Sequence, residues 1–277
     1  MTTAALSVLL ALFFLTSVVG VVTGSNSLIT VPAMYQFGID PRVAVATNMF
    51  GLTFMSAGGA LPFVGKGTIN RARLAPLLLL TLAGSVAGAL LVFAVPSPAM
   101  PVFVSVSMLA VALFTLFAPA RPVSRDAGAT RGRADLRAAE VASGEEADTR
   151  GGREWVGYAA TFLLGVYGGF FSGGYVTLLT AAFVALFRMR FVEAVATTKV
   201  VNVVSSLVAT VVFAAGGLVD FRLGAMLAVV MFAGAFAGAR VALRLDERAL
   251  RAVFLATVVL LALKILLYDL LWKGLER

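Results

Sequence analysis

The chain has 277 residues, of which 60% are hydrophobic and only 13% are charged. A soluble domain carries about 25% charged residues, and a water-soluble monomer of this length could not bury so much apolar surface. We therefore expect an integral membrane protein whose apolar side chains are covered by lipid. The net charge of +8 comes from a minority of residues, so its meaning depends on where those residues lie.

Cysteine and histidine are both absent. Their absence excludes disulfides, thiolate or imidazole metal sites, and every catalytic mechanism based on cysteine or histidine. No deep pair of carboxylates is present for acid–base chemistry, and no Gly-Lys-Ser/Thr element is present to hold nucleotide phosphates. We therefore expect neither an enzyme nor an ATP-driven pump, and no bound metal or cofactor.

Eight segments are apolar over about the 20 residues that a helix needs to cross a bilayer. They are residues 6–22, 43–64, 74–95, 99–118, 155–171, 191–215, 223–243 and 250–272. The first lacks a basic stretch before it and a convincing cleavage site after it. We interpret it as a retained membrane segment rather than a signal peptide.

Two further apolar segments, residues 27–37 and 174–187, are too short to cross a bilayer as straight helices. Each follows a glycine-rich break, at residues 20–27 and 165–174. A long helix, a break and a short stub predict a helical hairpin. Irregular backbone at membrane depth is tolerated only where it lines a cavity or is buried in protein, so the breaks are candidate functional sites.

One polar segment divides the chain. Residues 121–153 contain seven arginines and six acidic residues, which is 13 of the 36 charges. We interpret this segment as a connector that is helical in part, around residues 134–142. It separates a first transmembrane repeat (residues 1–118) from a second (residues 154–277), with residues 119–153 as the charged linker.

The two halves resemble each other. Shifting the sequence by 150 residues places the AVAT beginning at Ala44 on the AVAT beginning at Ala194, and Ser56 on Ser206. Between residues 44 and 89, 14 of 46 positions are identical to their counterparts. An internal duplication is therefore predicted.

Basic residues predict that the second repeat is inverted, because lysine and arginine collect in cytoplasmic loops. The connection before residue 74 in the first half is basic, but the corresponding connection in the second half is not. The connection at residues 96–101 is uncharged, but the corresponding connection in the second half is basic. The basic positions that we assign to the cytoplasm are Lys66, Arg71, Arg73, Arg188, Arg190, Arg244, Arg248 and Arg251. The linker is then cytoplasmic and both termini lie outside. Inverted repeats with broken helices are typical of secondary transporters whose site lies near the membrane midplane.

Lys199 is the strongest candidate for a functional charge, since charges inside spans are costly. It lies about 13 Å along its helix from Arg190, near the middle of the bilayer. Asn202 follows one turn later on the same face. An ammonium, an amide and several hydroxyls form an anion site. From the second repeat we include Thr177, Thr197 and Thr198, and from the first Asn26, Ser27, Thr47 and Asn48.

The breaks add a second set of anion-binding groups. Stubs that begin at residues 25–27 and 174–177 present free backbone N–H groups and the positive ends of helix dipoles, so Gly24, Ser25, Gly173 and Gly174 join the predicted site. The alternative is helix packing, which glycines four residues apart also serve. We leave both interpretations open at the breaks. For the pairs Gly84/Gly88 and Gly234/Gly238 we predict packing.

The motifs resemble a known family. In the second half they are GVYGGFFSGGYVTLLTAAF, EAVATTKVVNVVSSLVATVVFAAGGLVD and GARVALRL, and in the first GVVTGSNSLITVPAM, AVATN and GKGTIN. Together they are similar to the TauE/SafE/YfcA family of sulfite-exporter-like transporters, over nearly the whole chain outside the linker. The resemblance implies a bacterial inner-membrane permease for anions such as sulfite, sulfoacetate and other organosulfonates.

By this resemblance, Thr197, Thr198, Lys199 and Asn202 match the family's Thr-Thr-Lys…Asn stretch. Gly24 and Pro32 match a glycine-rich element followed by proline in the first repeat. The chain departs from the family where a richer glycine run is usual, because it has serine at 25, asparagine at 26 and serine at 27.

The sequence thus predicts an all-α integral membrane protein with two inverted repeats, each of about three full spans plus a broken hairpin. We expect a secondary transporter for a small sulfur-containing anion, driven by an ion or proton gradient through alternating access. Other interpretations stay open: a permease or channel for another ligand such as a carboxylate, a membrane enzyme, or a scaffold. The expected partners are the anionic substrate and the lipid bilayer, without nucleic acid; assembly into a homo-oligomer is left open.

Overall fold

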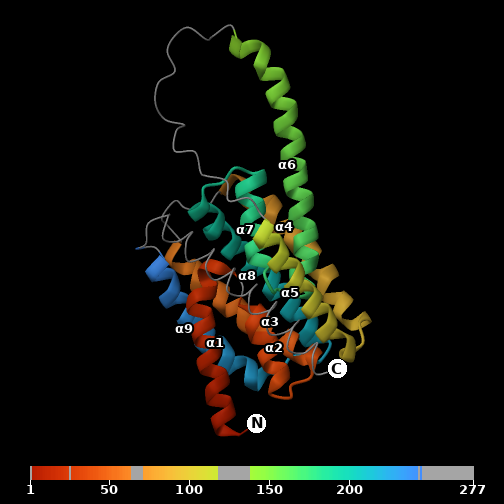
Figure 1. Cartoon of the computed structure of the whole chain (residues 1–277). Helices are drawn as coiled ribbons and strands as arrows, with labels where there is room; N and C mark the ends of the chain where they lie inside the picture. The colour runs from red at the N-terminus through yellow and green to blue at the C-terminus, as the bar shows by residue number, and fades with distance from the viewer. Residues whose placement is uncertain (1, 25, 64–70, 118–137, 243, 245–277) are drawn as a thin grey trace.

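The structure is a computed structural model that describes residues 2–24, 26–63, 71–117, 138–242 and 244 (Figure 1). Every regular element among these residues is helical, which confirms the all-α prediction. The long elements are α1 (Thr3–Thr23), α2 (Ser27–Gln36), α3 (Pro41–Ala60), α4 (Arg71–Ala94), α5 (Met100–Phe117), α6 (Ala138–Phe170), α7 (Tyr175–Leu186), α8 (Phe191–Ala215) and α9 (Phe221–Ala242). Two short 3₁₀ turns, η1 (Leu61–Phe63) and η2 (Ser97–Ala99), follow α3 and α4.

Five of these helices are long and apolar enough to cross a membrane: Thr3–Val21, Pro41–Ala60, Arg73–Ala94, Phe191–Ala215 and Phe221–Ala242. Large apolar side chains on their outer faces are exposed, among them Leu79 at 68% and Val229 at 70%. Lipid is the solvent that such surfaces require, so the chain is a multi-pass membrane protein. The predicted span at residues 250–272 lies outside the described residues.

Helix α6 begins earlier than the sequence indicated. We expected partial helix around residues 134–142 and a separate span from residue 155, but α6 is continuous from Ala138 to Phe170. Its first part projects from the bundle, away from the end where the N-terminus lies (Figure 1). Alanine, glutamate and arginine in residues 138–150 favour helix, and no proline interrupts it. The second half of the polar linker is therefore the start of α6.

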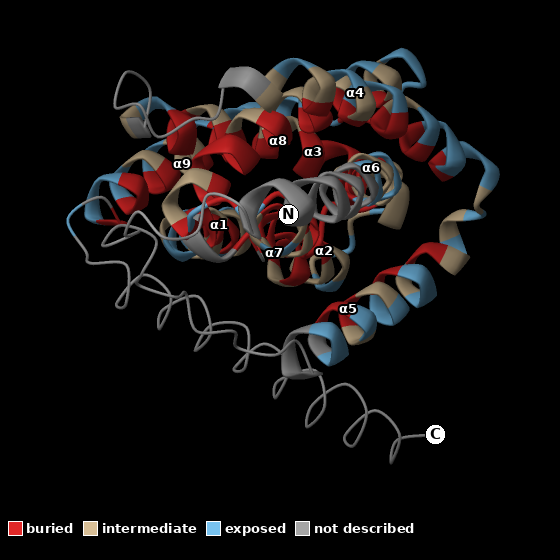
Figure 2. Ribbon diagram, turned by 90° about the horizontal axis from the view of Figure 1, so that it is seen from above, coloured by how far each residue is buried: buried red, intermediate tan, exposed pale blue. Residues whose placement is uncertain are grey.

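The middle of the bundle is formed by α3 and α8, which pack against each other. Helices α9 and α1 lie on one side of this pair and α4 and α6 on the other, while α5 lies at the periphery (Figure 2). Buried residues follow α3 from Ala44 to Ala60 on most of its surface. An apolar helix that is enclosed in this way is positioned by protein rather than by lipid, and it carries several side chains of the site.

Four glycines allow the outer helices to approach closely. A Cβ atom added at Gly88 of α4 would lie 1.9 Å from the carbonyl oxygen of Val166 in α6, and one at Gly238 of α9 would lie 2.1 Å from that of Val18 in α1. Gly84 and Gly234 make the same kind of contact one turn earlier. The prediction that these glycines serve packing is confirmed, and the partner in each case is the first helix of the other half.

Corresponding hydrogen bonds occur in the two halves. The Thr30 hydroxyl donates to Asn48 Oδ1 at 2.9 Å, joining α2 to α3. The Thr180 hydroxyl donates to the Thr198 hydroxyl at 3.4 Å, joining α7 to α8. The four residues are two pairs of counterparts under the 150-residue shift, so each stub is held to the following span in the same register.

The turn between α2 and α3 lies at the C-terminal end of α4. Arg42 Nε donates to the carbonyl oxygen of Val95 at 2.8 Å, and the Ser97 hydroxyl donates to Asp40 Oδ2 at 2.6 Å. Asp40 also caps α3 by accepting from the backbone N–H groups of residues 42 and 43. Slight burial opposes ionisation of Asp40, but these hydrogen bonds and the Arg42 charge outweigh it and lower the pKa of the carboxyl group.

The turn between α7 and α8 lies at the other end of α4. Arg73, near the start of α4, donates to the carbonyl oxygen of Phe187 at 3.1 Å and forms an ion pair with Glu154 of α6. Its guanidinium also lies over the Phe187 ring, 5.3 Å from the centroid. The two turns are counterparts under the 150-residue shift, yet they lie at opposite ends of one helix.

Candidate functional site

Both predicted breaks are present. Helix α1 ends at Thr23, and Gly24 adopts a left-handed conformation (φ 69°) with its N–H donating to the carbonyl oxygen of Gly20 at 2.7 Å. Helix α6 ends at Phe170, and Gly174 (φ 75°) is the cap residue that starts α7. Glycine reaches these φ values without steric cost, which explains why each interruption occurs where it does.

Each break touches the helix that follows the other break. A Cβ atom at Gly24 would lie 2.5 Å from Cβ of Val176 and 2.9 Å from the backbone nitrogen of Thr177. A Cβ atom at Gly173 would lie 2.7 Å from Leu28 Cδ2. Segments about 150 residues apart in the sequence therefore meet through glycines, and the beginnings of α2 and α7 lie next to one another.

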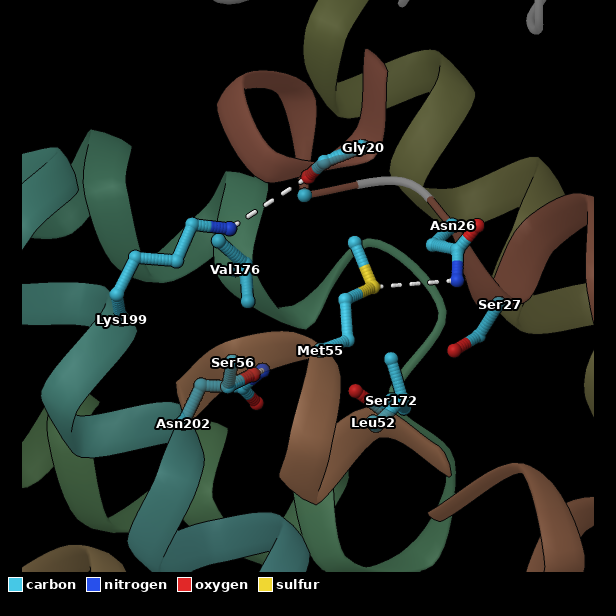
Figure 3. A pocket seen from close by; sticks show the side chains of 11 residues that line it. Gly20, Asn26, Ser27, Leu52, Met55, Ser56, Ser172, Val176, Lys199 and Asn202 are labelled. Atoms are coloured by element: carbon cyan, nitrogen blue, oxygen red, sulfur yellow. Dashed lines mark hydrogen bonds between the residues drawn. The ribbon is translucent and has the colours of Figure 1, made fainter. Parts of the chain in front are cut away.

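A small cavity lies where the breaks meet (Figure 3). It is lined by Gly20, Gly24, Asn26, Ser27, Leu52, Met55, Ser56, Ser172, Val176, Lys199 and Asn202. These residues come from the first break, α2, α3, the second break, α7 and α8. Five predicted site residues are among them: Gly24, Asn26, Ser27, Lys199 and Asn202.

Lys199 supplies the positive charge of the cavity. Its side chain is 2% exposed, and Nζ lies 3.5 Å from the carbonyl oxygen of Gly20. A separation of 3.5 Å is long for a hydrogen bond, so this oxygen, which also accepts the N–H of Gly24 at 2.7 Å, is a weak partner for the ammonium group. Gly59 lies beside the lysine stem, but the side chain that it makes room for is Val21: a Cβ there would be 2.6 Å from Val21 Cγ2 and at an ordinary contact distance of 3.7 Å from Lys199 Cδ. No acidic residue is among the described residues that line the cavity.

Two asparagines orient two serines. Asn48 Nδ2 donates to Ser27 Oγ at 2.9 Å, and Asn202 Nδ2 donates to Ser56 Oγ at 2.5 Å. A hydroxyl whose oxygen accepts an amide N–H is left to donate its own hydrogen elsewhere. Both serines line the cavity, so the amides make hydrogen-bond donors of them. The Asn202–Ser56 bond also joins α8 of the second half to α3 of the first.

Asn26 is a poorly satisfied polar side chain of the cavity. It begins α2 without a side-chain capping bond, and its Nδ2 donates to the thioether sulfur of Met55 at 3.3 Å. Its Oδ1 is buried and has no hydrogen-bond partner. Sulfur is a weak acceptor, so the Asn26 amide is held only loosely.

Several predicted donors are buried but do not line the cavity. Thr47 accepts the backbone N–H of Asp220 at 3.0 Å, which ties α3 to the start of α9. Asn48 supports Ser27, as described above. Thr198 accepts from Thr180, and the Thr197 hydroxyl has no partner.

The remaining predicted positions belong to the second break or lie outside the structure. Thr177 is buried in the first turn of α7. The carbonyl oxygen of Gly173 accepts the hydroxyl of Tyr167, and Gly174 packs against Val111 of α5. Ser25 lies outside the described residues. The predicted site residues did not include the lining residues Gly20, Leu52, Met55, Ser56, Ser172 and Val176. Gly20 and Ser172 lie within the predicted breaks, and Ser56 is the counterpart of Ser206, whereas Leu52, Met55 and Val176 carried no signal.

Comparisons with known proteins agree with this picture. Residues 9–265 match the model of a family described as "Sulfite exporter TauE/SafE". The chain is 31% identical over 101 residues to a probable membrane transporter protein, ORF9, of Sinorhizobium sp., covering 36% of this chain and 39% of that protein. It is 27% identical over 114 residues to a probable membrane transporter protein of Haemophilus influenzae, covering 41% and 45%. Each match spans less than half of the relative's length, and no solved structure matches the chain.

Proposed function

The chain belongs to the TauE/SafE family, and on this premise we propose that it is a secondary transporter for a small sulfur-containing anion, sulfite or an organosulfonate. It acts in the bacterial inner membrane, with the charged linker in the cytoplasm and both termini outside. Transport draws on an ion or proton gradient and needs no catalytic group.

The observation that carries the proposal is the composition of the cavity. One ammonium group, two serine hydroxyls set to donate and a loosely held amide face a small buried space. A sulfonate or sulfite group presents three oxygens that accept hydrogen bonds. It also carries a negative charge, which would pair with the ammonium group of Lys199. A metal cation is disfavoured by the same composition, because hard cations bind carboxylate and carbonyl oxygens.

Two helix beginnings add to the attraction for an anion. Asn26 and Ser27 start α2, and Val176 lies in the first turn of α7. The first backbone N–H groups of a helix have no partner within it, and the dipole makes this end positive. Both beginnings border the cavity, so they favour negative charge in the place that Lys199 also favours.

The cavity lies between the two halves, which suits alternating access. Lys199 reaches the carbonyl oxygen of Gly20 across the halves, and Asn202 reaches Ser56. An anion bound to Lys199 and Ser27 would join the same two halves. Rocking of one repeat against the other would then expose the site to one side of the membrane at a time.

The test is uptake of radiolabelled sulfite by proteoliposomes that contain the purified chain. We expect Lys199→Met to reduce uptake about 100-fold, because the anion would lose its charge partner in a buried site. Arg240→Met is the matched control: it removes a basic residue that stacks on Phe236, 4.1 Å from the ring centroid, and does not line the cavity. Normal uptake by the folded Lys199→Met protein would overturn the site. Competition by acetate but by no sulfonate would assign the site to carboxylates.

A further inference from the structure

Met55 places a flexible apolar side chain inside the cavity. It lies on α3, is 4% exposed, and accepts the Asn26 amide on its sulfur at 3.3 Å. Its methyl group lies beside the first break, since a Cβ at Gly20 would be 3.1 Å from Met55 Cε. Figure 3 shows the thioether between the Asn26 amide and the other lining residues. Met55 thus occupies space next to the donors that an anion needs.

The other apolar walls are fixed more firmly. Val176 is pressed against Gly24, where a Cβ would lie only 2.5 Å from it, so it cannot move without separating the two breaks. Leu52 is branched and buried one turn before Met55. A methionine side chain is unbranched and adapts to the space available. Of the described apolar side chains that line the cavity, Met55 can yield the most room at the least cost.

The hydrogen bond to Met55 is also the easiest one in the cavity to replace. An anionic oxygen is a much stronger acceptor for an amide N–H than a thioether is. An arriving oxyanion would therefore take the Asn26 amide from the sulfur, and the methionine would turn aside. The volume that it frees is limited by Val176 and Leu52.

Resting on the proposed function, we propose that Met55 is the residue that determines which anions the site accepts. Its sulfur holds the Asn26 amide, and its side chain takes up space beside the donors of the cavity. In the occupied site it limits the group attached to the oxyanion to a short substituent.

The experiment measures binding of a series from methanesulfonate to butanesulfonate by the purified full-length chain, using isothermal titration calorimetry. Wild-type protein should bind methanesulfonate best and lose affinity with each added carbon. Met55→Ala should improve butanesulfonate relative to methanesulfonate about tenfold or more, because three extra methylene groups gain apolar surroundings. Met55→Val should shift the order of affinities in the same direction but by a smaller amount. It replaces the alanine variant in the test if that variant does not fold.

Two variants separate size from hydrogen bonding and from general packing. Met55→Leu has a similar volume but is branched and has no sulfur, so it should keep the wild-type preference for short substituents and should not improve binding of butanesulfonate. Met49→Ala removes an equally buried methionine, 1% exposed, on the same helix but outside the cavity, and should leave the order unchanged.

Three results would overturn the inference. If the folded Met55→Ala protein binds the series in the wild-type order, or if Met49→Ala shifts the order equally, Met55 does not set specificity, while the proposed function stands. If wild-type protein binds neither sulfite nor any sulfonate, the proposed function fails and the role of Met55 fails with it.

Discussion

At the scale of single residues, Gly24 is the tightest constraint on the site. Its φ of 69° is a conformation that other residues adopt at a cost, and its Cα faces the Val176 side chain and the backbone of Thr177. Position 24 must therefore satisfy two requirements: the chain turns there, and it also packs directly against α7. Gly38 has a similar φ of 79° but open space around it.

The pair Gly24→Ala and Gly38→Ala separates these two demands. Gly38→Ala should cost only the left-handed conformation, about 1 kcal/mol. Gly24→Ala should cost about 3 kcal/mol, because a Cβ 2.5 Å from Val176 adds overpacking to the same conformational cost. Unfolding of the purified proteins in detergent, followed by circular dichroism, measures both. Equal losses of stability would show that the breaks separate freely.

Most of the polar residues that line the cavity could be predicted from the sequence, although Ser56 and Ser172 were missed, and none of its apolar side chains could be predicted. Lys199, Asn202, Asn26 and Ser27 are conspicuous because lysine, amides and hydroxyls are costly within apolar spans, and all four line the cavity. Met55 and Val176 look like any other membrane residue. Thr47 is the opposite case: it was predicted to bind the anion, but its hydroxyl accepts a backbone N–H of the other half instead. Only the packing of distant segments decides such cases.

At the scale of helices, the length of each helix could be predicted from the sequence better than the helices that pack against it. Bilayer thickness sets the length of an apolar segment, so α3, α8 and α9 begin and end within a few residues of the predicted spans. The glycine breaks also fell where predicted. The extension of α6 into the polar linker was missed because the prediction relied on apolar residues, which end at the membrane surface. Residues that favour helix continue beyond that surface.

Which helices pack together could not be predicted from the glycine spacing alone. Paired glycines one turn apart indicate a close neighbour but carry no information on its identity. The structure pairs α4 with α6 and α9 with α1, with carbonyl groups of the partner directly over the glycines. Each half therefore depends on the other for the contact that holds its outer helix.

Alanine at these positions tests the helix contacts. Gly88→Ala and Gly238→Ala should each lower the free energy of unfolding by about 2 kcal/mol, because the added methyl group meets a backbone carbonyl that cannot rotate away. Ala87→Leu is the control: Ala87 is on α4, next to Gly88, but faces outward and is exposed, so a larger side chain there should change stability by less than about 0.5 kcal/mol. Thermal unfolding of all three variants in one detergent makes the comparison. A stable Gly88→Ala protein would contradict the close packing of α4 on α6.

At the scale of the whole molecule, the site belongs to neither half alone. The ammonium of Lys199 approaches Gly20, Asn202 donates to Ser56, and Gly24 contacts Val176. Each of these contacts joins residues about 150 positions or more apart in the sequence. A cavity held by contacts between halves changes whenever the halves move, which is the property that alternating access requires.

The orientation of the halves gives the last prediction. Inversion, predicted from the exchange of basic residues between paired connections, requires the turn at Gly38 and its counterpart at Arg188 to face opposite sides of the membrane. The placement of these turns at opposite ends of α4 supports it. Because the natural chain has no cysteine, Gly38→Cys and Arg188→Cys can each be labelled without background. In intact cells a membrane-impermeant maleimide should label only Gly38→Cys, and both variants should react once the membrane is opened. Labelling of both from outside would show parallel halves, and labelling of Arg188→Cys alone would reverse the whole topology.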